Sequence, residues 1–459
     1  MKSYHRRTCV NKAVLLFLSC LLLVSVSGCG SSAVTGPNGF LYSANSFRPG
    51  SMAAFSVTTG ALVQIAGTPF VTNGNAPYTI AASPPALPSP APAVTTKFLY
   101  AGIPATSKGG VITRLLGRTL SGAVTGGIML MPINSDHTLA TSQMFASGGD
   151  YDPIAVAPGG NFLYAIDLTA NHLAAFSIDS SKGSLTAIGP PAGVAVGPDP
   201  FNVVVDPQGK FVFVANCDCV TNPQNHGSVS VFSINNDGTL AAVGTFVPGG
   251  IATAQPIALA VSPNSQFLFI ASLDDKVYVE SIAAGGTLAS VSCPPIPPNP
   301  NSPCALPPGS MPVSITVSID GGNTVYTGNA GTGTVSFFLN CTQTPLPIVA
   351  TTSVPCPTDG NGNALAPVVF QNNNPVGGTV GVVVPDPSSI AASTTITAIN
   401  PGHFLYVTDY DHGTILVFAV TSATTCTMTS CPTTAGTLTQ SGSAVNTGGQ
   451  NPFGLAFSF

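Results

Sequence analysis

The chain has 459 residues, a formal net charge of −5 and a charged fraction of only 6%. Its 12 lysines and arginines are too few to build the clustered basic surface that nucleic acid binding requires, so nucleic acid is not an expected partner. Hydrophobic residues make up 44% of the chain and occur in short β-branched runs. Despite the 49 glycines and 42 prolines, this pattern favours a folded all-β protein over a low-complexity chain.

Residues 1–28 have the features of a secretory signal. A basic start precedes an apolar run over residues 13–26. That run is shorter than the roughly 20 residues that a membrane span needs. It ends in Val26-Ser27-Gly28-Cys29, which resembles the lipobox of bacterial lipoproteins. The resemblance implies cleavage before Cys29 and acylation of its thiol and its new amino group, whereas an ordinary cleaved signal with an incidental cysteine is the alternative.

A lipoprotein would be held on a membrane through Cys29, with residues 29–38 as the lipidated end and tether. Several acyl chains give a stable anchor because each buried methylene adds about 0.8 kcal/mol. Gly30 follows the cysteine, and the absence of an aspartate there favours the outer membrane or the cell surface. We therefore expect an extracytoplasmic protein of the bacterial cell envelope. Without residues 1–28 the chain keeps eight basic and 17 acidic residues, a formal charge of −9.

An aromatic-aliphatic-aromatic triplet recurs along residues 39–459, at intervals of 49 to 80 residues. Uneven spacing around a constant pattern indicates a repeat fold with insertions in its loops. The seven copies, the sixth of them degenerate, begin at Phe40, Phe98, Phe162, Phe211, Phe267, Thr324 and Phe404.

Each triplet has the same neighbours, which predict four antiparallel strands per repeat. A strand ending in a Pro or Gly turn precedes the triplet, and an alternating strand, a Gly-containing turn and a weaker strand follow it. Seven such units predict a single seven-bladed β-propeller over residues 39–459, with strands A to D from innermost to outermost. The chain enters at strand B, at Phe40, and residues 451–457 have the pattern of a strand A. The C-terminal strand is therefore expected to complete the first blade and close the ring, which removes exposed sheet edges.

The phrases Phe404 to Asp409 and Phe211 to Asn216 resemble the YVTN-type repeats of lactonase-like seven-bladed propellers. The resemblance covers essentially all of residues 39–459 and implies the fold, but it leaves the activity open. Relatives include enzymes that hydrolyse 6-phosphogluconolactone or form muconolactones, and surface proteins without established chemistry. The Arg, His and Glu residues of those enzymes have poor counterparts here, because the only glutamate, Glu280, falls on a predicted strand C. A phosphosugar site would also need several convergent cations.

The connections B–C and D–A should emerge on one face of the propeller, and this face is the predicted functional site. It also receives the longest insertion, about residues 357–393, before the first strand of blade 7. The alternative is that hairpin loops are polar without converging on a site. The candidates in B–C loops are His172, His226 and His412 as a general base, and Arg48, Lys108 and Lys276 as ligand contacts.

Asp409, Asp411 and His412 form the densest polar cluster and are candidate ligand contacts. Two oxygen donors and one nitrogen specify no particular metal, so a polar turn is the preferred interpretation and no metal or cofactor is predicted. The residue that closes the repeated phrase is usually polar. It could form a polar ring, but Asn and Asp at such positions usually start a turn; the residues are Asn45, Asp167, Asn216, Asn329 and Asp409.

Eight cysteines follow Cys29, and an even number in an exported chain predicts disulfides. Cys293–Cys304 and Cys426–Cys431 are the easiest pairs to close, whereas Cys341–Cys356 would have to cross a predicted strand. Cys217 and Cys219, with His226, are also a possible soft-metal site. Disulfide formation is preferred, with one of these two cysteines expected to reach a neighbouring loop.

Two functions remain open. The preferred hypothesis is a lipid-anchored binding module whose polar face holds a glycan, a peptide or a partner protein. The alternative is a lactone hydrolase that uses His172, His226 or His412 as general base, since this reaction needs only a positioned water, a base and an oxyanion donor. A histidine paired with a carboxylate at a closed pocket would favour the enzyme, and a broad, shallow rim would favour binding.

Overall fold

The computed structural model divides the chain into two compact units, Met1–Pro37 and Asn38–Phe459, and every described residue belongs to the second unit. Among the residues described, no helix is long and apolar enough to cross a bilayer. The described residues are 39–47, 49–58, 61–73, 76–83, 97–105, 126–145, 149–220, 226–291, 304–306, 308–317, 324–339, 387–394, 403–410, 412–420 and 438–458.

The strands group into seven blades, and in each blade they run from the inner strand A to the outer strand D. Blades 1 to 4 are β31 (Pro452–Ser458), β1 (Gly39–Asn45), β2 (Ser51–Thr58), β3 (Ala61–Gln64); β5 (Ile80–Ser83), β6 (Phe98–Ile103), β7 (Gly127–Pro132), β8 (Gln143–Phe145); β9 (Tyr151–Val156), β10 (Phe162–Asp167), β11 (His172–Ile178), β12 (Leu185–Ile188); and β14 (Pro200–Val205), β15 (Phe211–Asn216), β16 (Ser228–Ile234), β17 (Leu240–Phe246). Blades 5 to 7, of which blade 6 has three described strands, are β18 (Pro256–Val261), β19 (Phe267–Ser272), β20 (Lys276–Ile282), β21 (Leu288–Val291); β23 (Pro312–Val317), β24 (Thr324–Asn329), β25 (Thr334–Leu339); and β26 (Pro387–Thr394), β27 (His403–Asp409), β28 (Thr414–Val420), β29 (Leu438–Gln440).

Strand C of four blades has a second, short outer partner. Each of these short strands pairs with strand C beyond the part that strand D covers. The outer edge of these blades therefore consists of two short strands instead of one. They are β4 (Phe70–Val71), β13 (Val194–Ala195), β22 (Cys304–Ala305) and β30 (Val445–Asn446).

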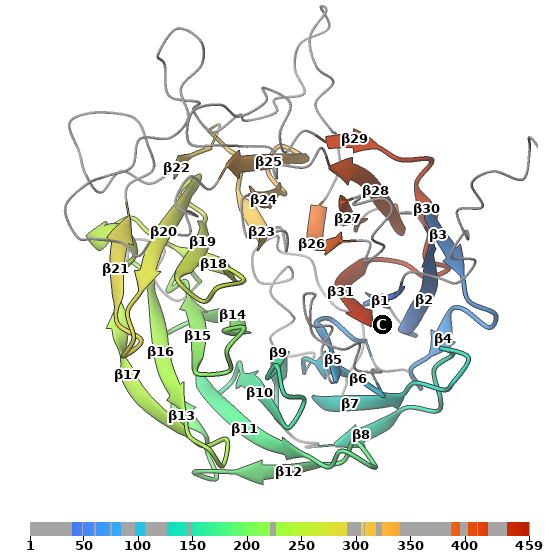
Figure 1. Cartoon of the computed structure of the whole chain (residues 1–459), viewed down its shortest axis with the longest axis horizontal. Coiled ribbons are helices and arrows are strands. Elements are labelled where there is room, and N and C mark those ends of the chain that lie inside the picture. Colours follow the sequence, from blue (N-terminus) through green and yellow to red (C-terminus); the bar gives the residue numbers. More distant parts are fainter. Residues whose placement is uncertain are drawn as a thin grey trace, which may run out of the picture. The chain divides into compact units, whose positions relative to one another are not determined.

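The seven A strands stand side by side in a closed ring (Figure 1). In order around the ring they are β31, β5, β9, β14, β18, β23 and β26, and β26 lies beside β31. The ring is closed because β31 pairs antiparallel with β1, placing Leu41 opposite Phe457 and Tyr42 opposite Ala456. The predicted seven-bladed propeller, with its first blade completed by the C-terminal strand, is confirmed.

Each repeated triplet contacts both neighbouring blades because successive residues of a strand point to opposite faces of the sheet. Its aromatic residues contact the C–D turn of the next blade: the hydroxyl of Tyr100 donates to the carbonyl of Gly183 at 2.6 Å, and that of Tyr164 to Gly238 at 3.1 Å. The turn residue has a positive φ, 70° at Gly183, and a Cβ there would lie 2.6 Å from the ring of Phe98. Blade 2 has His137 at this position, with φ 64° and its ring stacked on Phe40 at 3.4 Å.

The aliphatic residue of the triplet packs in the opposite direction, against the preceding blade. Leu163 shares a buried cluster with Phe98 and Tyr100, and Leu41 shares one with Phe404 and Tyr406. Each triplet therefore fills the two interfaces of its own blade. This explains why the pattern recurs while the loops between copies vary in length.

One predicted boundary is wrong. The insertion before blade 7 was expected over residues 357–393, but β26 is strand A of that blade and begins at Pro387. Its sequence, PSSIAAST, contains a single large aliphatic residue, Ile390. The strand therefore lacks the run of apolar residues that marks strand A elsewhere, and the rest of the predicted insertion lies outside the described residues.

Candidate functional site

The predicted site residues that the structure describes lie at B–C connections. His172 and Lys276 are the first residues of β11 and β20, and so begin strand C instead of lying within the loops. His226 lies just before β16, and His412 follows β27 and precedes β28. Arg48, Lys108 and Asp411 lie outside the described residues, so their predicted roles stay predictions.

Among the described residues of this face, His412 and Asp409 form the closest histidine–carboxylate pair. Nδ1 of His412 lies 3.0 Å from both carboxylate oxygens of Asp409, and the His412 backbone N–H points to Oδ1 at 3.3 Å. The Asp409 side chain is 6% exposed, whereas that of His412 is 60% exposed. A buried carboxylate bound to Nδ1 fixes the tautomer and orientation of an imidazole, so proton exchange with a substrate would run through Nε2.

The other two candidate bases have different surroundings. Nδ1 of His172 lies 2.6 Å from the carbonyl oxygen of Ala170, so a backbone group and not a carboxylate orients it. His226 is exposed, and in the described part of the chain it has no carboxylate within ion-pair distance. Of the three histidines, His412 has the arrangement expected of an oriented general base.

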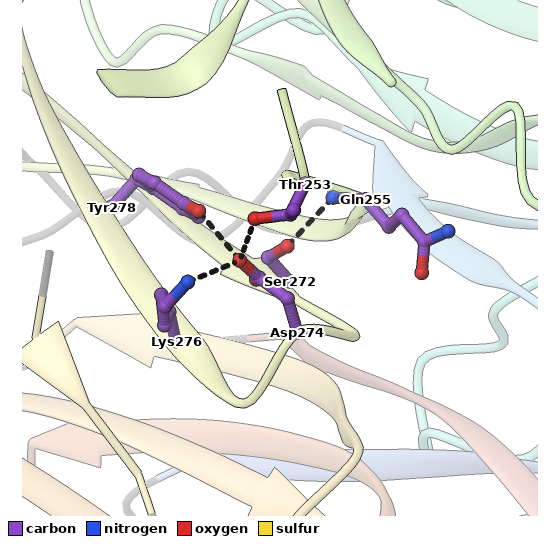
Figure 2. Close-up of polar contacts among 6 residues, drawn as sticks. All are labelled: Thr253, Gln255, Ser272, Asp274, Lys276 and Tyr278. Carbon is purple, nitrogen blue, oxygen red and sulfur yellow. Dashed lines mark hydrogen bonds and ion pairs between the residues drawn. The ribbon is translucent and has the colours of Figure 1, made fainter. Parts of the chain in front are cut away.

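A second polar group, in blade 5, is centred on Asp274 (Figure 2). Oδ2 of Asp274 accepts hydrogen bonds from Lys276 Nζ at 2.8 Å, the Tyr278 hydroxyl at 2.7 Å and the Thr253 hydroxyl at 3.3 Å. Burial, followed by the bond to Asp274, raises the pKa of Tyr278 above its ordinary value, which keeps the phenol protonated as a donor. The neighbouring Ser272 hydroxyl accepts the backbone N–H of Gln255 at 2.8 Å. We call Asp274, Lys276, Tyr278 and Thr253 the blade 5 polar cluster.

A buried carboxyl occupies an unusual position in blade 3. Asp152 is the second residue of β9, whereas the second residue of strand A is Phe201, Ile257 or Phe453 in blades 4, 5 and 1. Its Oδ1 accepts the hydroxyl and the backbone N–H of Thr79 at 2.6 and 3.2 Å, and its buried Oδ2 has no hydrogen-bond partner. Burial first, with Asp150 adding to it, raises the pKa of Asp152 to about 7.

Buried apolar side chains from the starts of several A strands pack against residues that directly follow two B strands. This inner apolar cluster joins residues from blades that are far apart in the sequence. Its members are Tyr78, Phe201, Cys217, Ile257, Tyr410 and Phe453, with Cys219 and Leu273 packed at its margin.

Cys217 and Cys219 are joined to each other by a disulfide. The expectation that one of them reaches a neighbouring loop is wrong, because the turn after β15 brings their Cα atoms within 5.0 Å of each other. The same bridge removes both thiolates from the proposed soft-metal site with His226. The remaining pairing candidates lie outside the described residues, or have side chains that do: Cys293, Cys304, Cys341, Cys356, Cys426 and Cys431. Cys29, the predicted lipidation site, also lies outside them.

The polar residue that closes the repeated phrase braces the hairpin, in agreement with the preferred interpretation. The mechanism differs between blades. Asp167 accepts the backbone N–H of Thr169, two residues on, at 3.0 Å, which is the predicted turn. Asn216 instead donates across the sheet to the hydroxyl of Ser230 at 3.0 Å, and Asn329 to that of Ser336 at 2.8 Å. The amide N–H groups of Asn216 and Asn329 are therefore occupied within their own blades, whereas their buried Oδ1 atoms have no hydrogen-bond partner.

Sequence reasoning gave Asp152 and Asp274 less weight than the Asp409–His412 cluster, although these two carboxyls have the most distinctive surroundings. Asp274, Lys276 and Tyr278 alternate along one strand and its approach, so their shared face was readable from period-two spacing. Asp152 was readable only by aligning the blades, because it stands where the A strands of blades 1, 4, 5 and 6 carry an apolar residue. Among the described residues, no group of three His, Cys, Asp or Glu side chains has the geometry of a metal site.

Comparison with known proteins agrees with this architecture. Residues 115–302 match the family described as "Lactonase, 7-bladed beta-propeller". A putative 6-phosphogluconolactonase from Bacteroides fragilis has a similar structure, with a TM-score of 0.56 and 15% identity over 92% of this chain and 98% of that one. The periplasmic gluconolactonase of Pseudomonas aeruginosa gives a TM-score of 0.56 and 14% identity over 92% of this chain and 99% of that one. At such identities the likeness to these structures establishes the fold.

Proposed function

We propose that this chain, a lactonase-like seven-bladed β-propeller, hydrolyses an unphosphorylated lactone outside the cytoplasm, with His412 as the general base. The observation that carries the proposal is the contact between His412 and the buried carboxylate of Asp409. The family match over residues 115–302 supports a lactonase. The similar structure of a periplasmic gluconolactonase supports both the class of substrate and the compartment.

In the proposed reaction His412 accepts a proton from water through Nε2, and the water oxygen attacks the lactone carbonyl carbon. The bond between that carbon and the ring oxygen then breaks, and the ring oxygen takes the proton back from the imidazolium. The product is the open hydroxy acid. Asp409 acts throughout by holding the imidazole in one orientation and by stabilising its protonated form.

The charge of the chain supports an uncharged substrate over a phosphorylated one. A phosphate site needs several convergent cations. Lys276 is already paired with Asp274 at 2.8 Å. The formal charge of −9 without residues 1–28 also opposes the approach of an anion. Arg48, Lys108 and Asp411 remain proposed ligand contacts.

A binding module for a glycan, peptide or partner protein is the second candidate, and a different observation favours it. The side chain of His412 is 60% exposed, and Tyr410, two residues before it, belongs to the buried inner apolar cluster. This arrangement suits a shallow surface that contacts a larger partner. In either case the proposed location is the bacterial cell envelope, with acylated Cys29 as the membrane anchor.

The test is a lactone-hydrolysis screen on the purified protein with its disulfides formed. The panel contains gluconolactone, its phosphorylated form, an acyl-homoserine lactone and an aromatic lactone. His412→Ala should lower kcat by a factor of about 10² to 10⁴, the usual contribution of a positioned base. His226→Ala is the matched control and should retain the parent rate. Equal rates in the two variants would remove His412 from the mechanism, and a folded parent without turnover on any lactone would favour the binding module.

A further inference from the structure

The disulfide between Cys217 and Cys219 joins two residues that differ in exposure. Cys217 is fully buried and belongs to the inner apolar cluster. Cys219 is partly exposed at the margin of that cluster, and the next residue, Val220, is 45% exposed. A thiol from outside the propeller therefore reaches the bridge more readily at Cys219 than at Cys217.

Hydrogen bonds hold the bridged segment in place without the help of the disulfide. Asp199, just before β14, accepts the backbone N–H of Cys217 at its carbonyl oxygen and that of Val220 at Oδ2, both at 2.9 Å. The N–H of Asp218 donates to the carbonyl oxygen of Pro198 at 3.3 Å. The bridge itself spans a sequence separation of only two residues, and the stabilisation by a disulfide falls as the closed loop becomes shorter. The segment should therefore keep its position when the bridge is reduced.

A disulfide with one accessible and one buried sulfur, on a segment that does not depend on it, is organised for reaction more than for stability. Exposed disulfides are the labile or catalytic ones, and an accessible reactive cysteine is often found beside a resolving one. We propose that Cys217 and Cys219 form a thiol–disulfide exchange site that oxidises a dithiol. Cys219 is the sulfur that is attacked, and Cys217 is the sulfur that is released. This activity is independent of the proposed lactone hydrolysis.

The exchange proceeds in two steps. One thiol of the dithiol loses its proton and its sulfur bonds to Sγ of Cys219, while the bond between Cys219 and Cys217 breaks and Cys217 takes up a proton. The second sulfur of the dithiol then attacks the first, and Cys219 is released as a thiol. The dithiol has become a disulfide, and the propeller has gained two electrons and two protons as the thiols of Cys217 and Cys219.

The experiment compares the two sulfurs in the complete chain. Cys217→Ala leaves only Cys219 and Cys219→Ala leaves only Cys217, so each variant is the matched control of the other. Both are treated with glutathione disulfide, and peptide mass spectrometry follows the mixed disulfide at the remaining cysteine, with circular dichroism as the check on folding. In the parent, dithiothreitol and reduced thioredoxin are compared at equal concentration, and alkylation of the peptide that contains Cys217 and Cys219 measures its reduction.

We expect the mixed disulfide to form about tenfold faster in Cys217→Ala than in Cys219→Ala, because burial protects Cys217. In the parent the bridge should be reduced while the circular dichroism of the folded chain is retained. Faster reduction by thioredoxin than by dithiothreitol would identify the substrate as a protein dithiol, and slower reduction would identify it as a small dithiol. Equal rates in the two variants, or reduction of the parent only in urea that unfolds it, would overturn the exchange site.

Discussion

Replacing Asp152 by asparagine should stabilise the propeller above neutral pH and change its stability little near pH 4. In the folded protein the pKa of Asp152 is raised from its ordinary 3.8 to about 7, chiefly because the carboxyl is buried. The folded chain therefore holds a proton on Asp152 that the unfolded chain has already lost between these two pH values. Stability falls as the pH rises through this window and remains lower above it.

The size of the effect follows from the same two pKa values. A raise from 3.8 to about 7 corresponds to about 4 kcal/mol of lost stability at pH 8, since each pKa unit is 1.36 kcal/mol. Asparagine keeps an oxygen for the hydroxyl and the N–H of Thr79 and carries no charge at any pH. It therefore removes the loss above neutral pH and leaves the protonated state at pH 4 nearly unchanged.

The assay is urea unfolding of the parent and Asp152→Asn at pH 4 and pH 8, with disulfides intact. The gain in unfolding free energy should approach about 4 kcal/mol at pH 8 and be close to zero at pH 4. Asp237→Asn is a control whose effect on stability should have the opposite pH dependence. The hydroxyl and N–H of Thr239 hold the pKa of Asp237 below its usual value, so the stabilisation by Asp237 is lost as the pH falls. Equal effects of Asp152→Asn at the two pH values would refute the argument.

Three further predictions concern how the blades are held together. Gly183→Ala should cost about 1–3 kcal/mol more than Gly442→Ala in urea unfolding, because both glycines have a positive φ but only Gly183 faces an aromatic ring, that of Phe98; equal costs would mean that the turn does not pack on the preceding blade. Replacing Cys217 and Cys219 together by alanine should lower the unfolding free energy by about 1–2 kcal/mol, the small value expected for a very short closed loop, and a larger loss would show that the bridge organises the inner apolar cluster. Deleting residues 452–459 removes β31 and exposes the edge of β1, so size-exclusion chromatography should show aggregation; a stable monomer would contradict the role of β31 in closing the ring.

The fold was predictable because its determinants repeat. Each triplet carries one residue for the preceding blade and two for the next, so seven weak local patterns reinforce one another. Closure was also readable, since the repeat begins with a strand B at Phe40 and residues 451–457 have the pattern of a strand A. Strand A of blade 7 was misplaced because its small residues, apart from Ile390, give no apolar run.

The candidate site was less predictable because its properties come from residues that are distant in the chain. The buried carboxyl of Asp152 is bound by Thr79, which is 73 residues away and in another blade. The position of His412 in a B–C connection was predicted, and the closeness of Asp409 followed from three-residue spacing. The surroundings of Asp274 could not be predicted, because they depend on how β20 packs against the D–A connection. This packing brings Tyr278 and Thr253 to one oxygen of Asp274 and leaves the other without a partner.

Pairing of β31 with β1 has a consequence for biosynthesis. The two strands are the most distant in the described chain, with Leu41 opposite Phe457. A growing polypeptide can form the hairpins of each blade as soon as they emerge, but it cannot complete its first blade until the last strand has been made. During most of its synthesis the chain therefore has a blade 1 with an open edge at β1. Pairing of β31 with β1 then closes a loop of nearly the whole chain. If the chain is exported, as proposed, a chaperone that covers β1 during this interval would favour correct closure over pairing with another copy.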